Sequence, residues 1–341
     1  MDKFKRIRAY RTGWIIPFLD IILTMPWLHS LVWRKAKSIK LDYLQLEGKT
    51  LKESRQLIEQ DIKHGAFFMT NHRDIILDAS WLSMLLHDRY MIRPFVGVGD
   101  NLLSKWFIEV AFRFNRGFVV LRQGGPREIL QNSQLLSEYI QSLRAKGKSI
   151  WLAQREGRAK DSDDRTQPAV IKMLTLAADK NLDFLAQVRA LNICPVSISY
   201  EFDPCDYLKA AEFQLKRDNP DWKKTKHDDR VSMWTGLKGK NGRVIFRLTP
   251  SINHWIDANI EALNEMGKND QLRAIATQID KQIFAGYEIF EHGTEFDKYI
   301  ESRLALIDIP NKDEAFLREK LYEMYNNPVK NHEESNISGL F

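Results

Sequence analysis

The feature that most constrains the fold is the regular exchange of two hydrophobic patterns from about residue 49 onward. Short apolar runs typical of strands occupy 66–70, 94–98, 117–121, 149–153, 193–200 and 243–248. Between them, apolar residues recur at helical spacing in 51–62, 79–87, 101–113, 127–145, 168–180 and 204–215. Strands that alternate with helices favour crossover connections, which join parallel neighbours. We therefore predict an α/β fold with a mainly parallel central sheet flanked by helices.

The chain after these units has a different pattern. Residues 216–242 are polar and predict a surface excursion before the last strand, whereas 254–266, 269–285, 294–305 and 312–326 predict helices. A frayed tail is expected after Asn327. These patterns divide the chain into a basic and apolar segment at 1–48, an α/β domain at 49–250 and a helical C-terminal extension at 251–341.

Charge and composition restrict the class of protein. Residues 1–40 hold nine Lys and Arg and two Asp, a net charge of +7, so the other 301 residues carry −1 of the total of +6. The basic character therefore lies at the N-terminus, whereas a nucleic-acid enzyme more often spreads cations over its binding face. Two cysteines, Cys194 and Cys205, exclude a disulfide framework and a Cys-rich zinc site.

An apolar stretch runs from Trp14 to Trp33 between two basic clusters, and Pro17, Asp20 and Pro26 interrupt it. It contains no 18-residue apolar run that would predict an ordinary membrane-spanning helix. Tryptophans with flanking Lys and Arg suit the interface of an anionic membrane. We interpret the stretch as a monotopic helical element on the cytoplasmic face. The alternative is a helix packed on the domain with a solvated basic flank.

Three loops after predicted strands carry polar residues that can do chemistry. In the first, His72 precedes Asp74 and Asp78, and a carboxylate that orients one imidazole nitrogen leaves the other free as a general base. The alternatives are a polar helix start with Asn71 or Asp74 as its cap, or a metal ligand without a second ligand group.

The second loop, 154–161, places Glu156, Gly157 and Arg158 directly after a strand, with Arg155 and Lys160 nearby. Arginine matches the geometry of a phosphate, so this charge run predicts an anion site as well as a solvated turn. The third loop brings Arg122 to the end of a strand, before two glycines. Here an ordinary turn is the simpler interpretation.

The order of these blocks resembles the glycerolipid acyltransferase superfamily, which includes glycerol-3-phosphate and lysophosphatidic acid acyltransferases. The resemblance covers roughly residues 66–200. It rests on four short blocks: Asn71-His72-Arg73-Asp74 with Asp78, Gly117-Phe-Val-Val-Leu-Arg122, Arg155-Glu156-Gly157-Arg158 and Ile193-Cys194-Pro195-Val196-Ser197.

The resemblance implies an O-acyltransferase of phospholipid biosynthesis. His72 would be the general base that deprotonates an acceptor hydroxyl, which attacks the thioester of acyl-CoA or acyl carrier protein. The acceptor would be a phosphate-bearing glycerolipid, with lysophosphatidic acid as the first candidate. Neither a metal nor a cofactor is implied. The acceptor site would be lined by Arg122, Glu156, Gly157 and Arg158, with Pro195 shaping the pocket.

Two departures from the family pattern affect these expectations. The family reads His-x4-Asp, but position 77 is Leu77, so either Asp78 or Asp74 pairs with His72. We favour Asp78, because Asp74 is placed to cap a helix. The family also reads Phe-Pro-Glu-Gly-Thr-Arg where this chain has Gln-Arg-Glu-Gly-Arg-Ala, and this difference bears on the identity of the acceptor.

Two other functions fit parts of the sequence. A non-catalytic lipid-binding or membrane scaffold would have kept the fold without needing His72, Asp78, Glu156 and Arg158 together. A metal-dependent phosphoesterase would use His72, Asp74 and Asp78, but the sequence offers no further ligand cluster.

Overall fold

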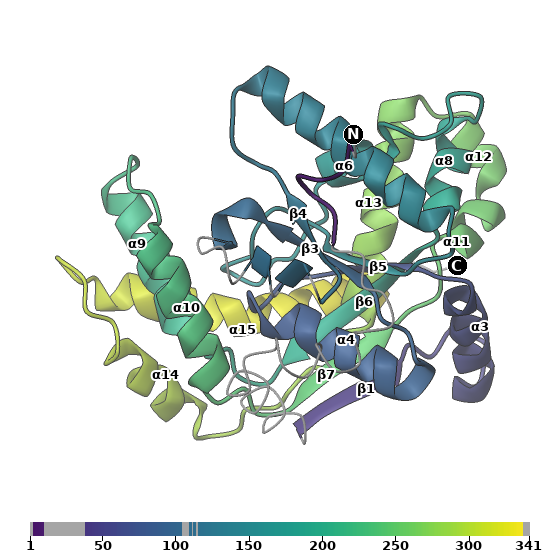
Figure 1. The fold of residues 1–341 in the computed structure, drawn as a ribbon. Coiled ribbons are helices and arrows are strands. Elements are labelled where there is room, and N and C mark those ends of the chain that lie inside the picture. Colours follow the sequence, from purple (N-terminus) through teal and green to yellow (C-terminus); the bar gives the residue numbers. More distant parts are fainter. Residues whose placement is uncertain (1–2, 10–37, 104–108, 111, 114, 337–341) are drawn as a thin grey trace.

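The computed structural model describes residues 3–9, 38–103, 109–110, 112–113 and 115–336. Its centre is a seven-stranded sheet in the order β1-β7-β6-β2-β5-β3-β4 (Figure 1). Only β6 and β7 are antiparallel, and the other neighbours run parallel. The predicted α/β fold with a mostly parallel sheet is confirmed. The strands are β1 (Ile39–Tyr43), β2 (Phe67–Thr70), β3 (Phe95–Gly99), β4 (Gly117–Val120), β5 (Ile150–Ala153), β6 (Ile193–Tyr200) and β7 (Val244–Leu248).

Helices connect the strands and form the C-terminal region. They are α3 (Leu51–Lys63), α4 (Leu77–Tyr90), α6 (Pro126–Arg144), α7 (Pro168–Thr175), α8 (Phe184–Leu191), α9 (Asp206–Asp218), α10 (Lys226–Lys238), α11 (Asn253–Ala258), α12 (Ile260–Asn264), α13 (Lys268–Ala285), α14 (Phe296–Leu304) and α15 (Glu314–Asn336). A short 3-10 turn, η2 (Asp100–Leu102), follows β3.

Two hydrophobic layers cover the two faces of the sheet. Successive residues of a strand point to opposite faces, so Phe67 and Met69 join one core and Phe68 joins the other. The first core is closed by α6, α7, α8, α11, α12 and α13. The second is closed by α3, α4 and Leu237 of α10 (Lys226–Lys238). Because both faces are buried, the central strands read in the sequence as continuous apolar runs.

A third, smaller core joins α9, α14 and α15, around Ala210, Ile300 and Leu317. Figure 1 shows these helices together to one side of the sheet, away from α8, α11 and α12. Helix α13 packs on β6, and α14 packs on α9. Helix α15 connects the two regions, because it packs on both α13 and α9.

Part of the segment expected as a separate N-terminal unit belongs to the fold. The strand β1 pairs with β7, and the Ile7 carbonyl accepts a hydrogen bond from Val119 N at 2.8 Å. The boundary at 48/49 therefore separates an edge strand from its own sheet. The Trp14–Trp33 stretch lies outside the described residues. In the part of the chain that is described, no helix has both the length and the apolar character to cross a membrane.

The structure corrects two predictions in the second half of the chain. Helix α10 lies within the polar excursion at 216–242, and its capping box, Thr225 with Asp228, marks its start. The tail expected to fray after Asn327 continues α15 to Asn336. Polar contacts hold it there, because Asn327 Nδ2 donates to the Asp161 carbonyl at 2.9 Å and His332 Nδ1 lies 2.8 Å from the Phe284 carbonyl.

Candidate active site

The predicted loops lie along one edge of the sheet. Strands β2, β3, β4, β5 and β6 all run in the same direction, so their carboxyl ends share that edge. The loops after β2, β4 and β5 carry His72, Arg122 and the 154–161 segment, respectively. In open parallel sheets this edge is where ligands bind.

His72 pairs with Asp78, and not with Asp74. The distance from His72 Nδ1 to Asp78 Oδ2 is 2.9 Å. The His72 side chain keeps 14% of its surface exposed, whereas that of Asp78 is fully buried. The imidazole also packs edge-on against Trp151 of β5, with ring centroids 6.0 Å apart. A buried carboxylate behind a partly exposed imidazole is an arrangement suited to a general base.

The hydrogen bonds around Asp78 define which nitrogen of His72 is free. Its Oδ2 accepts from the backbone N–H of Arg73 at 2.7 Å and of Asp74 at 2.9 Å. Its Oδ1 accepts from the Tyr200 hydroxyl at 2.9 Å. Because Asp78 is the acceptor in all three of these bonds, it is the acceptor toward His72 as well, and Nδ1 of His72 donates to it. The lone pair of the imidazole is then on Nε2.

Asp74 has a structural role at the start of α4. Its Oδ1 accepts from the backbone N–H of Ile76 at 2.8 Å and of Leu77 at 2.7 Å. These are amide groups that a helix start leaves without an intrahelical partner. Burial raises the pKa of the Asp74 carboxyl, and the nearby charge of Asp78 raises it further. Of the two carboxylates that the sequence offered as partners of His72, Asp78 therefore binds the imidazole and Asp74 binds the backbone at the start of α4.

Arg122 and Glu156 bring the loops after β4 and β5 together. Arg122 Nη1 lies 3.5 Å from Glu156 Oε1, and both side chains retain access to solvent. Gly157 has a φ of +69°, a left-handed conformation that glycine adopts without strain. This turn is exposed, and a partly exposed guanidinium beside it can contact an anionic ligand.

Arg158 lies near several carboxylates and is only partly exposed to solvent. Although burial works against its charge, Cys205, Asp74 and Asp203 beside it raise the pKa of the guanidinium. Its Nη1 is buried and finds no hydrogen-bond partner among the described residues. Arg158 therefore lies near the start of α4 and near the loop after β6, where these negative charges favour its charged form.

Pro195 lies inside the sheet. It pairs with Met69 of β2 in the middle of β6, and its carbonyl accepts from Thr249 Oγ1 at 2.7 Å. Pro195 therefore lies level with Met69, one position before the end of β2, and its contacts are with other strands of the sheet.

Three residues hold the His72 loop in ways that the sequence did not predict, although it offered Asn71 as a helix cap and contained Arg73 in the first block. Tyr200 at the end of β6 binds Asp78. Arg73 Nη2 pairs with the buried Asp164 at 3.0 Å. Asn71 replaces a backbone pairing partner, because its amide donates to the Ile198 carbonyl at 2.9 Å and accepts from Ile198 N at 2.8 Å. Their sequence signal was only position, since each stands at or just beyond a strand end.

Three buried oxygens gather where β2 and β5 end. Thr70 Oγ1, Gln154 Oε1 and Asp164 Oδ1 have no hydrogen-bond partner in the described structure. Buried polar atoms without a partner are rare, and a water molecule or a polar group of a ligand commonly satisfies them. This edge of the sheet therefore has polar groups available for such a contact.

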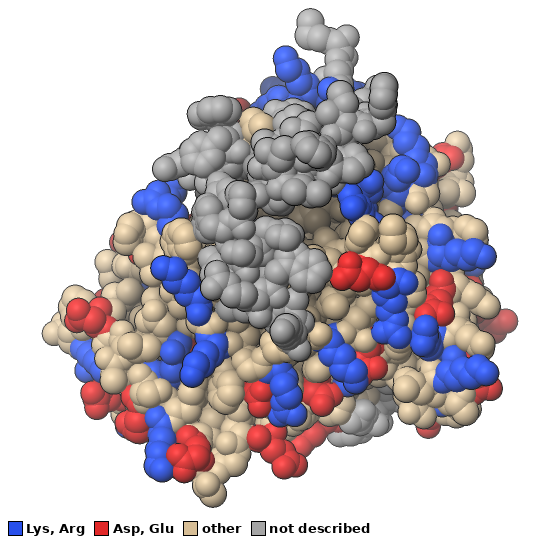
Figure 2. All heavy atoms as spheres, turned by 60° about the horizontal axis from the view of Figure 1, so that its bottom comes forward, with Lys and Arg blue, Asp and Glu red and all other residues tan. Residues whose placement is uncertain are grey.

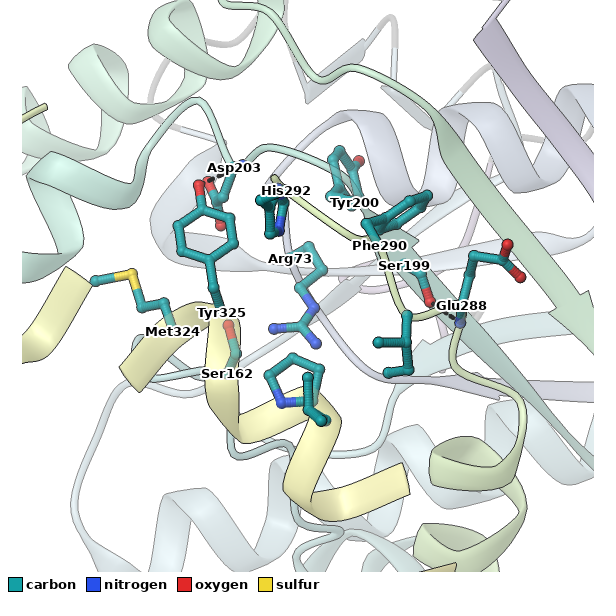
Figure 3. Close-up of a pocket in the computed structure, with 13 residues that line it drawn as sticks. Arg73, Ser162, Ser199, Tyr200, Asp203, Glu288, Phe290, His292, Met324 and Tyr325 are labelled. Atoms are coloured by element: carbon teal, nitrogen blue, oxygen red, sulfur yellow. Dashed lines mark hydrogen bonds between the residues drawn. The ribbon is translucent and has the colours of Figure 1, made fainter. Parts of the chain in front are cut away.

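A cavity lies beside this region, between the end of β6, residues 288–292 and α15 (Figure 3). The Arg73 side chain points into it, and Ser162, Ser199 and His292 also line it. Arg73 contacts the first hydrophobic core through Tyr287, whereas His72 contacts Trp151 of the second. The Arg73 and His72 side chains therefore leave the loop toward opposite faces of the sheet.

Among the described residues, no three His, Cys, Asp or Glu side chains come together in a group that could hold a metal ion. Figure 2 shows positive and negative side chains interspersed over the described part of one face, in keeping with the near-neutral charge of the chain beyond residue 40.

In comparisons with known proteins, neither a protein-family model nor a curated protein matches the chain.

Proposed function

We propose that the protein is an O-acyltransferase that transfers a fatty acyl group from acyl-CoA or acyl carrier protein to the hydroxyl of a phosphate-bearing glycerolipid. Lysophosphatidic acid is the first acceptor to test. The observation that carries this proposal is the 2.9 Å contact between His72 Nδ1 and the buried Asp78 carboxylate at the carboxyl end of β2. The order of the four sequence blocks supports the reaction class.

The reaction follows from this pair. Asp78 holds the proton on Nδ1, so Nε2 of His72 takes the proton of the acceptor hydroxyl as its oxygen attacks the thioester carbonyl carbon. The tetrahedral intermediate collapses with cleavage of the carbon–sulfur bond. The departing thiolate then receives the proton from the imidazolium. Asp78 stabilises the imidazolium while it exists and stays ionised throughout.

The acceptor's phosphate requires a cation near the reacting hydroxyl, which places the two substrates in one geometry. We assign this contact first to Arg122, because its side chain is partly exposed and its pair with Glu156 is long. Glu156, Gly157 and Arg158 form the turn against which the acceptor would lie. We further propose that the protein works at the cytoplasmic face of a membrane, to which the basic N-terminal segment attaches it.

The test is thiol release from a panel of acyl-CoAs and acyl carrier proteins. Lysophosphatidic acid, glycerol 3-phosphate and neutral lysolipids serve as acceptors. Turnover should require a phosphate-bearing acceptor, disappear in His72→Ala and persist in His87→Ala, whose histidine neighbours the exposed Asp88. Retained turnover in His72→Ala would refute the proposal. Metal-dependent phosphate release that a chelator abolishes would replace it with the phosphoesterase reading.

A further inference from the structure

Tyr200 contacts the carboxylate oxygen of Asp78 that His72 leaves free. Tyr200 is the last residue of β6, and its ring packs on Trp81 of α4 with centroids 5.8 Å apart. Its hydroxyl donates to Asp78 Oδ1 at 2.9 Å, whereas His72 contacts Oδ2. The carboxylate therefore joins the tyrosine hydroxyl to the imidazole.

Tyr200 differs from the other described donors to Asp78. The two N–H groups on Oδ2 belong to the backbone of residues 73 and 74, and their positions are set by the loop itself. Tyr200 arrives from a different strand and brings a side-chain hydroxyl. Burial raises the pKa of this phenol well above its usual range, so the hydroxyl stays protonated and remains a donor.

We propose that Tyr200 is a positioning residue that sets how strongly Asp78 attracts the proton of His72. A hydrogen bond to Oδ1 draws charge away from Oδ2 and weakens the pull on Nδ1–H. The lone pair on Nε2 of the imidazole then remains available to accept a proton. The structural part of this inference stands on the described contacts, and only its kinetic consequence rests on the proposed acyltransferase function.

Other charges near Asp78 act on the same pair. Arg73 and Asp74 belong to its own loop, and Asp203 follows β6 close to Tyr200. Arg158 lies near Asp74 and Asp203, and Lys209 forms an ion pair with Asp203. From β5, the neighbour of His72 is the uncharged Trp151. These groups stay in place when the Tyr200 hydroxyl is removed, so the effect of that hydroxyl can be measured separately.

The experiment is a titration of the histidine side chains by NMR in the full chain, with the His72 signal assigned by its loss in His72→Gln. Tyr200→Phe should move the His72 titration upward by about half a pH unit or more. Tyr287→Phe is the matched control, because Tyr287 donates at 3.3 Å to Asp164, a buried carboxylate that pairs with Arg73 instead of His72. The control should leave the His72 titration unchanged.

Tyr200→Leu separates the hydroxyl from the shape of the ring. If the hydroxyl acts as proposed, both variants at position 200 shift the titration upward. An unchanged titration in Tyr200→Phe, or a shift in Tyr200→Leu alone, would overturn the positioning role. The far-UV circular dichroism of each variant verifies that the fold is kept. A Tyr200→Phe variant that does not fold would make the hydroxyl a structural group and would also overturn the positioning role.

The pH profile of kcat/KM for thiol release separates this inference from the proposed function. Its acid limb should move upward in Tyr200→Phe together with the His72 titration. A shifted titration with turnover that survives in His72→Ala would keep the positioning role and reject the acyltransferase mechanism. An unshifted titration with turnover that depends on His72 would keep the mechanism and reject the role of Tyr200.

Discussion

Gly236 of α10 lies directly against the carboxylate of Asp74, so closely that a Cβ atom at position 236 would be 1.9 Å from Asp74 Oδ2. Asp74 caps the start of α4, four residues before Asp78. The contact therefore connects a helix of the polar 216–242 region to the loop that carries His72. Only a residue without a side chain fits at this point.

Gly236→Ala should displace Asp74 and destabilise the protein. We expect a loss of about 1–3 kcal/mol in the free energy of unfolding, the usual range for overpacking a filled site. Urea unfolding measures it. Gly125→Ala is the control, because a Cβ there meets open space, and it should cost only about 0.5 kcal/mol, since alanine is a poorer helix N-cap than glycine. Equal midpoints for the two variants would contradict the steric account.

The two carboxylates of the His72 loop should respond differently to amide substitution. Asp78→Asn places an amide group among donors that need an acceptor, and we expect a loss of turnover of about a hundredfold or more. Asp74→Asn keeps an oxygen for the cap and should have a much smaller effect. Steady-state rates of thiol release provide the comparison, with circular dichroism to verify the fold. The reverse ranking would assign the pairing role to Asp74.

The two arginines of the predicted acceptor site can be told apart by the quantity they change. Arg122→Ala should raise the KM for the phosphate-bearing acceptor about tenfold, with a smaller effect on the acyl donor, because it removes one charge-assisted contact. An unchanged acceptor KM would remove Arg122 from the site.

Arg158→Ala should act mainly on stability. It removes a partly buried positive charge near Asp74 and Asp203, and Asp203 keeps its ion pair with Lys209, so we expect a loss of only about 1 kcal/mol in the free energy of unfolding. Urea unfolding would show the loss. A raised acceptor KM at unchanged stability would instead return Arg158 to direct phosphate binding, as the sequence alone suggested.

The sequence predicted the strands that are buried on both faces, because β2, β5 and β6 read as continuous apolar runs. It missed β1, an edge strand in which Lys40 and Asp42 alternate with apolar residues. It missed α10 because the charged face of that helix resembles a loop. In each case the element is held by contacts with distant parts of the chain, β1 by its pairing with β7 and α10 by its packing against Asp74. The local sequence pattern does not contain such contacts.

The candidate site shows the same limit. The short spacing of His72, Asp74 and Asp78 in the sequence identified them as candidates. The sequence could not decide which carboxylate pairs with His72, because this depends on where α4 begins. Tyr200 was beyond reach, because it is 122 positions from Asp78 and meets it only through the pairing of β2 with β6. Arg158 was expected to face a ligand because charge runs are normally on the surface, and the carboxylates around it come from distant segments.

The predicted membrane attachment needs a test that spares the sheet. Removing residues 1–40 would also remove Ile7, which is buried, and the start of β1. Charge substitution avoids this damage. Each cation removed should weaken binding to anionic vesicles by about 1 kcal/mol. The variant replaces with Gln the four cations Arg11, Arg34, Lys35 and Lys37.

Vesicle co-sedimentation measures the change, with vesicles of phosphatidylcholine alone as a reference. The control variant replaces four cations on exposed positions of the body, Lys146, Lys148, Lys172 and Lys180. It should bind anionic vesicles like the unaltered protein. Equal loss in both variants would show that binding follows total charge, and no loss in either would remove the membrane role from the N-terminal segment.

A second histidine–carboxylate pair predicts a pH dependence of stability far from the candidate site. His254 Nε2 of α11 lies 2.8 Å from Asp61 Oδ1 of α3, and this hydrogen bond raises the pKa of His254 above its ordinary value. The folded state therefore holds the proton more tightly than the unfolded chain. The stabilisation is complete below the ordinary pKa of histidine and is lost as the pH rises through the raised value. Because 38% of the His254 side chain is exposed, solvent screening limits the effect to below about 1 kcal/mol.

Urea unfolding of the unaltered protein and of His254→Gln at pH 5.5 and 8.5 should show a larger difference in the free energy of unfolding at pH 5.5. A difference that is equal at both values, or larger at pH 8.5, would mean that the charge of His254 does not contribute.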